Sequence, residues 1–414
     1  MRLYSNNKTN SKNSDINEKR KAWQILLVVY LASIAVTMSM MKIPPVMNIL
    51  LTDLNTTMAV GGFFMSAFMI PGVILAIPVA SFLNIYGPKK CGLIALGFTI
   101  FGSIFGSLAQ GSPILLLIGR LIEGVGFAGI MVVAPSVISM WFEPKKRGLP
   151  MGIWATWVPV GMFIIYNLAK PLELAFGWRG IWLFNAFFAF IAFLAFYKIV
   201  DYPTVLKNIK IDEKCQNQPQ GNLSQGLKNK NIWILTFIFL IFGMTIQSYT
   251  TWLPTYLTES GLQPTKANFS ASLIPMGMIL ANIIGGLILI YIKNHKFILI
   301  FGLTLNMIAL SMWFRLGSVF MVIPWMMAVG ISSGLTPPCI FTMAPETVSR
   351  AEFVGIALAL VNMGFNLGSI IGPPIIGMIV SKGGWAPIEY FVIAPMFIGI
   401  LIALTINIKE KVIA

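Results

Sequence analysis

Charged side chains are scarce in this chain of 414 residues, where Asp, Glu, Lys and Arg together make up 10%. A soluble globular domain carries about 25% of such residues. Apolar residues make up 57% of the chain, and they form runs of about 20 residues that are long enough to cross a bilayer as helices. The composition therefore predicts an all-α membrane protein, and the continuous runs exclude the alternating pattern of a transmembrane β-barrel.

Residues that build catalytic and metal sites are equally scarce. The chain has one histidine, His295, in a short loop among lysines, and three scattered cysteines, Cys91, Cys215 and Cys339. Since no two cysteines form a CxxC pair, neither a disulfide framework nor a zinc site is indicated. The sequence also lacks a loop of the form G-x-x-x-x-G-K-[ST], which argues against ATP as the energy source. We therefore expect no cofactor, no metal and no enzymatic activity.

The apolar runs predict twelve transmembrane spans. They are expected at residues 23–48, 57–84, 91–109, 113–138, 149–169, 180–199, 232–256, 267–291, 297–314, 318–343, 353–380 and 388–408. A polar segment rich in Asn, Gln and Lys, residues 201–231, separates the first six spans from the last six and is expected to be a cytoplasmic linker. We thus predict an N-terminal bundle at 23–200, a C-terminal bundle at 232–408, and short polar tails at 1–22 and 409–414. Two such halves are typical of transporters whose site lies near the bilayer midplane.

Basic residues are distributed unevenly over this layout. Most of the 29 Lys and Arg residues lie on the side that carries both termini. Since basic residues concentrate in the cytoplasmic loops of membrane proteins, both termini are predicted to be cytoplasmic, in the inner membrane of a cell. The formal net charge of +15 therefore reflects orientation in the membrane, and it gives no support for nucleic acid as a partner.

Two charged residues interrupt the apolar pattern inside one predicted span. Arg120 and Glu123 lie three residues apart between Pro113 and Trp141, where an ionisable group costs about 2.5–3.5 kcal/mol and normally faces protein or a water-filled cavity. Arg120 can hold an oxyanion through two parallel hydrogen bonds, or it can form a structural ion pair with Glu123. Glu123 is either a fixed counter-ion or the group that takes up a proton and couples transport to the proton gradient.

Further candidate residues lie near the ends and in the middle of other spans. Lys42, just before Pro44 and Pro45, either snorkels to the outer interface or adds positive charge to a central cavity, which would favour anions. The other candidates for substrate contact are polar or aromatic residues of spans 5, 7 and 11: Trp157, Gln247, Tyr249 and Asn362. For each of these, packing or hydrogen bonding between helices is the alternative.

Several short motifs stand at the expected ends of spans. After the second span the sequence reads Ala80-Ser-Phe-Leu-Asn84-Ile-Tyr-Gly87-Pro88-Lys89-Lys90, and after the fourth it reads Trp141-Phe-Glu-Pro-Lys-Lys-Arg147-Gly148. Arg120-Leu-Ile-Glu123-Gly124 has the form R-x-x-[QE]-G. Together these motifs resemble those of the major facilitator superfamily, whose loop after span 2 has the form G-x-x-x-D-R-x-G-R-R. Gly87 and the basic pair match that loop, whereas Asn84 replaces its Asp.

The resemblance covers essentially the whole chain. It implies the major facilitator fold, with twelve transmembrane helices in two pseudo-symmetric six-helix bundles that expose a central site to each side in turn. It also implies a cytoplasmic gating loop that includes Asn84, Gly87, Lys89, Lys90 and Arg147. Within the superfamily, Lys42-Ile-Pro44-Pro45 and Gln247-Ser-Tyr249 resemble the cyanate-permease-type branch, whose substrates are anions.

These observations lead to one expected function and two alternatives. We expect a monomeric secondary transporter or facilitator in the lipid bilayer that carries a small organic or inorganic anion bound by Arg120 with help from Lys42. Symport and antiport both remain open. A drug or lipophilic-compound exporter of the same superfamily is the first alternative, and a membrane sensor that transports nothing is the second.

Overall fold

The computed structural model describes residues 2–143, 146–202, 229–292, 294–311, 319–348 and 354–406. Within these ranges every regular element is a helix, which confirms the predicted all-α class. The predicted linker 201–231 and the tail 409–414 fall largely or wholly outside the described residues, so the domain boundaries stay predictions. The helix that contains span 1 begins at Arg2, so helical structure extends through the segment predicted to be a polar tail.

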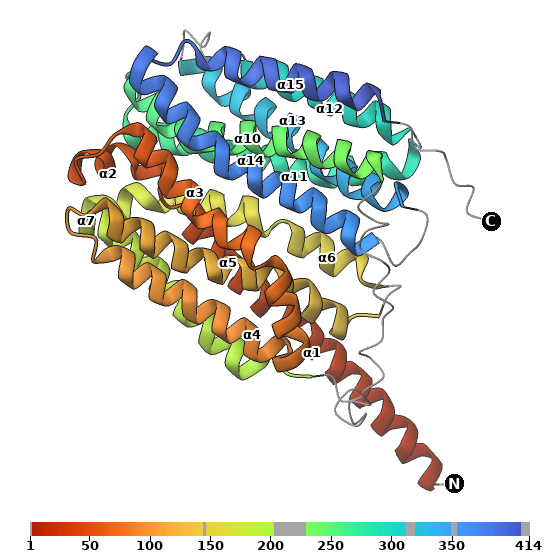
Figure 1. Ribbon diagram of the computed structural model, residues 1–414. Helices are drawn as coiled ribbons and strands as arrows, with labels where there is room; N and C mark the ends of the chain where they lie inside the picture. The colour runs from red at the N-terminus through yellow and green to blue at the C-terminus, as the bar shows by residue number, and fades with distance from the viewer. Residues whose placement is uncertain are drawn as a thin grey trace.

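The first half of the chain forms the N-terminal bundle (Figure 1). Its helices are α1 (Arg2–Met41), the 3-10 turn η1 (Pro44–Val46), α2 (Met47–Asp53), α3 (Met58–Ile74), α4 (Ala76–Ser107), α5 (Pro113–Trp141), α6 (Gly148–Ala155) and α7 (Trp157–Ile199). The start of α5 shows why the sequence folds this way locally. Ser112 caps the helix by accepting a hydrogen bond from the Leu115 N–H, and Pro113 fits the first turn, where no amide donor is needed.

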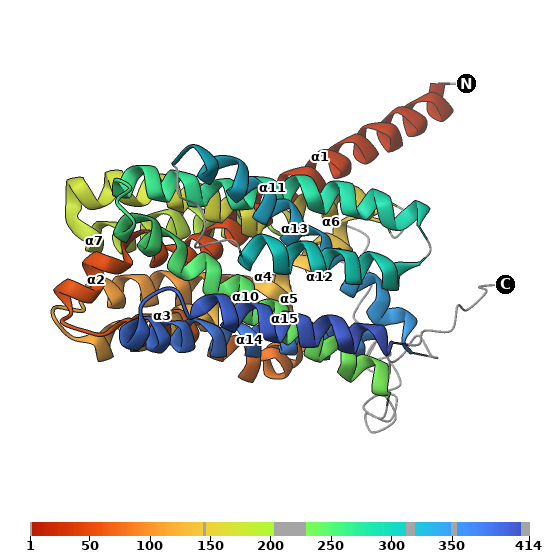
Figure 2. The ribbon, with the colours of Figure 1, turned by 90° about the horizontal axis from the view of Figure 1, so that it is seen from above.

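The second half forms the C-terminal bundle, which lies beside the first (Figures 1 and 2). Its helices are α10 (Lys230–Glu259), α11 (Pro264–Tyr291), α12 (His295–Ser311), α13 (Val319–Glu346), α14 (Val354–Gly383) and α15 (Ile388–Leu404). The two bundles meet mainly through α3 against α14 and α7 against α11.

Two glycines turn the chain sharply inside elements that otherwise read as single helices. Gly87 in α4 has φ 76° and Gly177 in α7 has φ 69°, a region of backbone conformation that favours glycine. Eight helical segments of the described chain are long and apolar enough to cross a membrane, and three shorter apolar helices accompany them. Since one of the eight, Gly148–Ile199, contains two spans that meet at Gly177, the described helices account for the twelve predicted spans.

The two bundles are joined by hydrogen bonds toward one end of the molecule. The start of α1 and the end of α15 lie at one end (Figure 1), here called the terminal end, and α2 lies at the opposite, far end. Hydrogen bonds join the bundles toward the far end: Asn268 Nδ2 donates to the Pro45 carbonyl at 3.2 Å and the Tyr166 hydroxyl donates to the Thr250 carbonyl at 2.8 Å. The structure is therefore closed at the far end.

Candidate functional site

A cluster of ionised and polar side chains lies inside the N-terminal bundle. It contains Lys42 from the residue after α1, Ser103 from α4, Arg120 and Glu123 from α5, and Asn185 from α7, and all five are 0% exposed. The cluster thus joins the chain at the end of α1 to α4, α5 and α7. We call these five residues the charge cluster.

Arg120 is enclosed by backbone carbonyls. Its Nε donates to the Phe64 carbonyl at 3.1 Å, Nη2 donates to Met40 at 3.1 Å, and Nη1 donates to Ser39 at 2.6 Å. Nη1 also donates to Glu123 Oε2 at 2.6 Å. Ser39 and Met40 belong to the last turn of α1, whose carbonyls lack partners within the helix and carry the negative end of its dipole. Arg120 therefore caps α1 from the side, and in this conformation it faces no open cavity.

Lys42 also points into the bundle. Its Nζ donates to Glu123 Oε1 and, at 3.1 Å, to Ser103 Oγ, and it lies 4.5 Å from the centre of the Trp182 ring. The alternative that Lys42 snorkels to the outer interface is therefore wrong for this structure. The physical reason is that α1 ends at Met41 and the chain turns into η1, which directs the next side chain between α4, α5 and α7.

The charge cluster carries an excess of positive charge. Two cations share one carboxylate, and aromatic faces supply part of the missing compensation, since the Arg120 guanidinium also lies 4.4 Å from the centre of the Phe68 ring. Ser103 Oγ donates to Glu123 at 2.6 Å and accepts from Asn185 Nδ2 at 3.1 Å.

Some polar atoms in and beside the cluster are buried without a partner in the described part of the chain: Ser39 Oγ, Trp182 Nε1 and Asn185 Oδ1. Unpaired buried polar atoms are rare in proteins, so the cluster has unused capacity for hydrogen bonds.

The other predicted substrate contacts lie elsewhere. Trp157 stacks on Trp154 with ring centres 5.9 Å apart, in the N-terminal bundle. Gln247, Tyr249 and Asn362 belong to the C-terminal bundle, whereas the hydrogen bonds of the charge cluster among the described residues stay within the N-terminal bundle. Asn362 Nδ2 donates to Leu358 in its own helix, whereas Gln247 Nε2 is buried and has no partner among the described residues. The structure thus leaves the substrate role of all four as a prediction.

The residues of the expected gating loop contact other residues of the N-terminal bundle. Lys89 Nζ lies 5.6 Å from the centre of the Tyr197 ring, and Arg147 Nε donates to the Phe142 carbonyl at 2.7 Å, at the end of α5. Gly87 forms the turn between spans 2 and 3, Lys90 is exposed, and the side chain of Asn84 lies outside the described residues. The gating role of this loop stays a prediction.

Comparison with known proteins identifies the family. The sequence profile of the Major Facilitator Superfamily matches residues 29–295 and 261–412. The chain belongs to the major facilitator superfamily. It is 21% identical over 376 residues to the probable sulfoacetate transporter SauU of Cupriavidus necator, covering 86% of each chain. It is 23% identical over 383 residues to the D-galactonate transporter of Escherichia coli O6:H1, covering 84% of this chain and 87% of that one.

The fold of this superfamily member also matches a solved structure. The crystal structure of a D-xylose–proton symporter aligns with a TM-score of 0.74 and 14% identity, covering 92% of this chain and 96% of that chain. The major facilitator fold, the multi-pass membrane location and the absence of an enzymatic role expected from the sequence are therefore confirmed. The narrower resemblance to the cyanate-permease-type branch stays a prediction.

Sequence reasoning missed part of the charge cluster of this major facilitator protein. It singled out Lys42, Arg120 and Glu123 but not Ser103, Asn185 or the Trp182 ring. A signal for Asn185 was present, because an amide inside an apolar span is costly and therefore has a function or a partner. Ser103 gave no comparable signal, since a serine in a membrane helix is often satisfied by its own backbone.

Proposed function

We propose that this major facilitator protein carries small organic acids, with the charge cluster as its anion site. One observation carries the proposal: two buried cations, Lys42 and Arg120, share the single carboxylate of Glu123. A buried charge without a counter-ion is costly, so an anionic substrate stabilises this cluster where a neutral one does not. The relatives named for sulfoacetate and D-galactonate transport agree with an acidic substrate.

Substrate binding in this proposal is an exchange of anions. The carboxylate or sulfonate of the substrate takes the place of Glu123 on both Lys42 and Arg120, so the number of charge-assisted hydrogen bonds is kept. In the structure the cluster is enclosed and the far end is closed, which fits a resting conformation without substrate. Rocking of the bundles would then bring Gln247, Tyr249 and Asn362 of the C-terminal bundle toward the substrate, whereas Trp157 lies in the same bundle as the charge cluster. The unpaired Nε2 of Gln247 is the donor most ready to bind the substrate.

Proton coupling follows from the same exchange. A Glu123 side chain that loses both cations is an isolated carboxyl group in a dry protein interior, where the neutral form is favoured. One proton is therefore taken up for each anion bound, which makes the protein an anion–proton symporter. The terminal end, rich in basic residues, faces the cytoplasm in this proposal, and the protein lies in the inner membrane.

Flux measurements on purified protein in liposomes test the anion site. We expect uptake of sulfoacetate or D-galactonate, and at least a tenfold loss of uptake in Lys42→Met and in Arg120→Lys, which keeps the charge but not the fork of donors. Lys170→Ala is the matched control, because this lysine pairs with Glu173 at the far end and not with the cluster. Unchanged anion uptake in both cluster variants would refute the site, and resistance to lipophilic drugs in those variants would favour an exporter.

A second measurement separates coupling from binding. In Glu123→Gln we expect uptake driven by a pH gradient to be lost, whereas exchange of internal for external substrate persists. If gradient-driven uptake survives in this variant, Glu123 is a counter-ion only and the coupling group lies elsewhere.

A further inference from the structure

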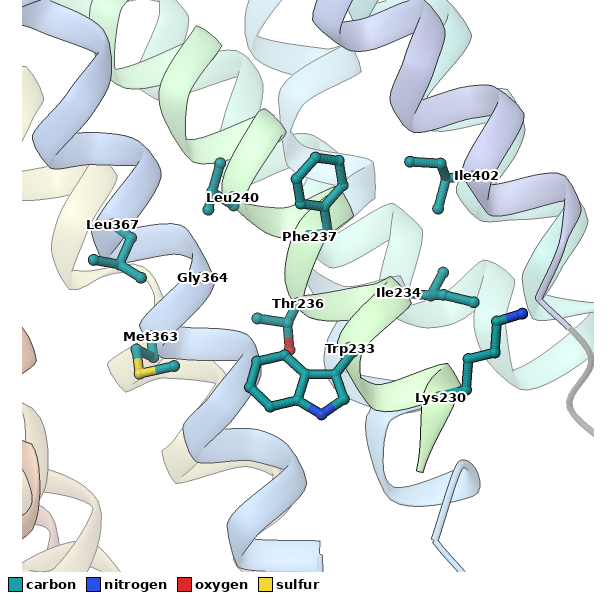
Figure 3. A pocket seen from close by; sticks show the side chains of 10 residues that line it. All are labelled: Lys230, Trp233, Ile234, Thr236, Phe237, Leu240, Met363, Gly364, Leu367 and Ile402. Atoms are coloured by element: carbon teal, nitrogen blue, oxygen red, sulfur yellow. The ribbon is translucent and has the colours of Figure 1, made fainter. Parts of the chain in front are cut away.

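An apolar groove lies on the outer surface of the C-terminal bundle, away from the charge cluster. It has a volume of about 450 Å³, within the range of about 300–1,000 Å³ that is usual for small-molecule sites. Helix α10 forms its floor, with Met363 and Leu367 of α14 on one side and Ile402 of α15 on the other (Figure 3). Gly364 lets α14 pack directly against the Thr236 carbonyl of α10, which keeps this floor continuous.

One face of α10 supplies a gradient from charge to apolar surface along the groove. Lys230 stands in the first turn, and Trp233, Phe237 and Leu240 follow on the same face. From Lys230 to Leu240 this stripe rises by about 15 Å, which equals about half of the ~30 Å hydrocarbon thickness of a bilayer. Trp233 and Phe237 are 44% and 45% exposed, so the stripe faces outward. The groove thus has the length of one leaflet.

Charge decides which lipid fits this groove. None of the ten residues that line it is acidic, and its one ionised group is the exposed Lys230. Lys230 is also the first residue of α10, where the positive end of the helix dipole adds to the potential of the ammonium group. Trp233 lies one turn deeper, and tryptophan is enriched at the headgroup level of membranes.

We propose that this groove binds an anionic phospholipid, with its phosphate on Lys230 and one acyl chain along Trp233, Phe237 and Leu240. A basic residue at the membrane surface attracts anionic lipid, and the apolar walls from α14 and α15 hold the chain in place. The lipid bridges α10, α14 and α15, the three helices whose side chains line the groove (Figure 3). All lining residues belong to α10, α14 and α15 of one bundle, so the groove does not lie between the bundles, where a transport substrate would bind.

Native mass spectrometry of the full-length protein in detergent tests the headgroup. We expect phosphatidylglycerol to bind about fivefold more tightly than phosphatidylcholine, the ratio that one lysine contact with an anionic lipid provides. Lys230→Ala should remove this preference. Lys198→Ala is the matched control, because Lys198 is an exposed lysine in the last turn of α7, also at the terminal end but outside the groove.

Fluorescence quenching tests the position of the chain. The emission of Trp233, isolated as the difference between the protein and its Trp233→Phe variant, should be quenched more by brominated phosphatidylglycerol than by brominated phosphatidylcholine. Leu367→Trp, which fills the groove without changing charge, should weaken the binding of phosphatidylglycerol. Equal binding of both lipids by the unaltered protein, or a preference that survives in Lys230→Ala, would overturn the proposal.

Discussion

Replacing Glu123 with Gln removes the only anion of the charge cluster while nearly preserving its shape. Arg120 Nη1 lies 2.6 Å from Glu123 Oε2, and two unit charges at that distance attract by roughly 6 kcal/mol at an effective dielectric constant of about 20. The desolvation of both groups offsets part of this attraction. Loss of one partner of a buried pair still costs about 3–5 kcal/mol, because the other charge is left unpaired, and in this cluster two cations would be left.

We therefore expect Glu123→Gln to lower the free energy of unfolding by about 3–5 kcal/mol. The double variant Lys42→Met with Glu123→Gln should be more stable than Glu123→Gln alone, because the second change removes one of the two unpaired cations. Unfolding in mixed micelles of increasing SDS fraction, followed by tryptophan fluorescence, measures both values. A double variant that is less stable than the single one would refute the assignment of excess positive charge.

The exposed pair of Glu143 and Lys146 provides the control for this experiment. The two side chains are 71% and 67% exposed and lie 2.8 Å apart, and the hydrogen bond and charge of Lys146 lower the pKa of the Glu143 carboxyl. Exposed pairs contribute little to stability. Glu143→Gln should therefore leave the unfolding transition unchanged, so a loss of similar size in both variants would show that the assay does not report burial.

Two further predictions concern the closed far end. Gly62→Ala would place a Cβ 2.5 Å from the Pro373 carbonyl oxygen, so we expect α3 and α14 to separate and a cysteine placed beside them at the far end to react faster with a membrane-impermeant thiol reagent. Tyr166→Phe removes the hydrogen bond to Thr250, worth about 1 kcal/mol, and should shift the conformational equilibrium about fivefold toward opening at the far end. Labelling rates unchanged from those of the parent protein would contradict each prediction.

The spans were predictable from sequence because a helix that crosses a membrane needs an apolar run of about 20 residues. Glu123 was recognisable as a partner of Arg120, since residues three apart share a helical face. The pairing of Lys42 with Glu123, 81 residues away, was not, because it depends on how α1 ends and how α4, α5 and α7 pack around that end. The sequence likewise did not show which of the other candidate residues lie near the charge cluster, because that depends on how the helices pack in three dimensions.

The side-on capping of α1 by Arg120 has a mechanical consequence. The same stretch of chain that offers its last carbonyls to the guanidinium continues through Lys42 to Pro45, whose own carbonyl accepts a hydrogen bond from Asn268 of the opposite bundle. Only two residues, Ile43 and Pro44, therefore lie between the lysine that would meet a substrate and the residue whose carbonyl joins the two bundles. A movement of Lys42 therefore also moves Pro45 and strains its hydrogen bond to Asn268. Binding of an anion at Lys42 and separation of the bundles at the far end are thus coupled through one short segment of chain.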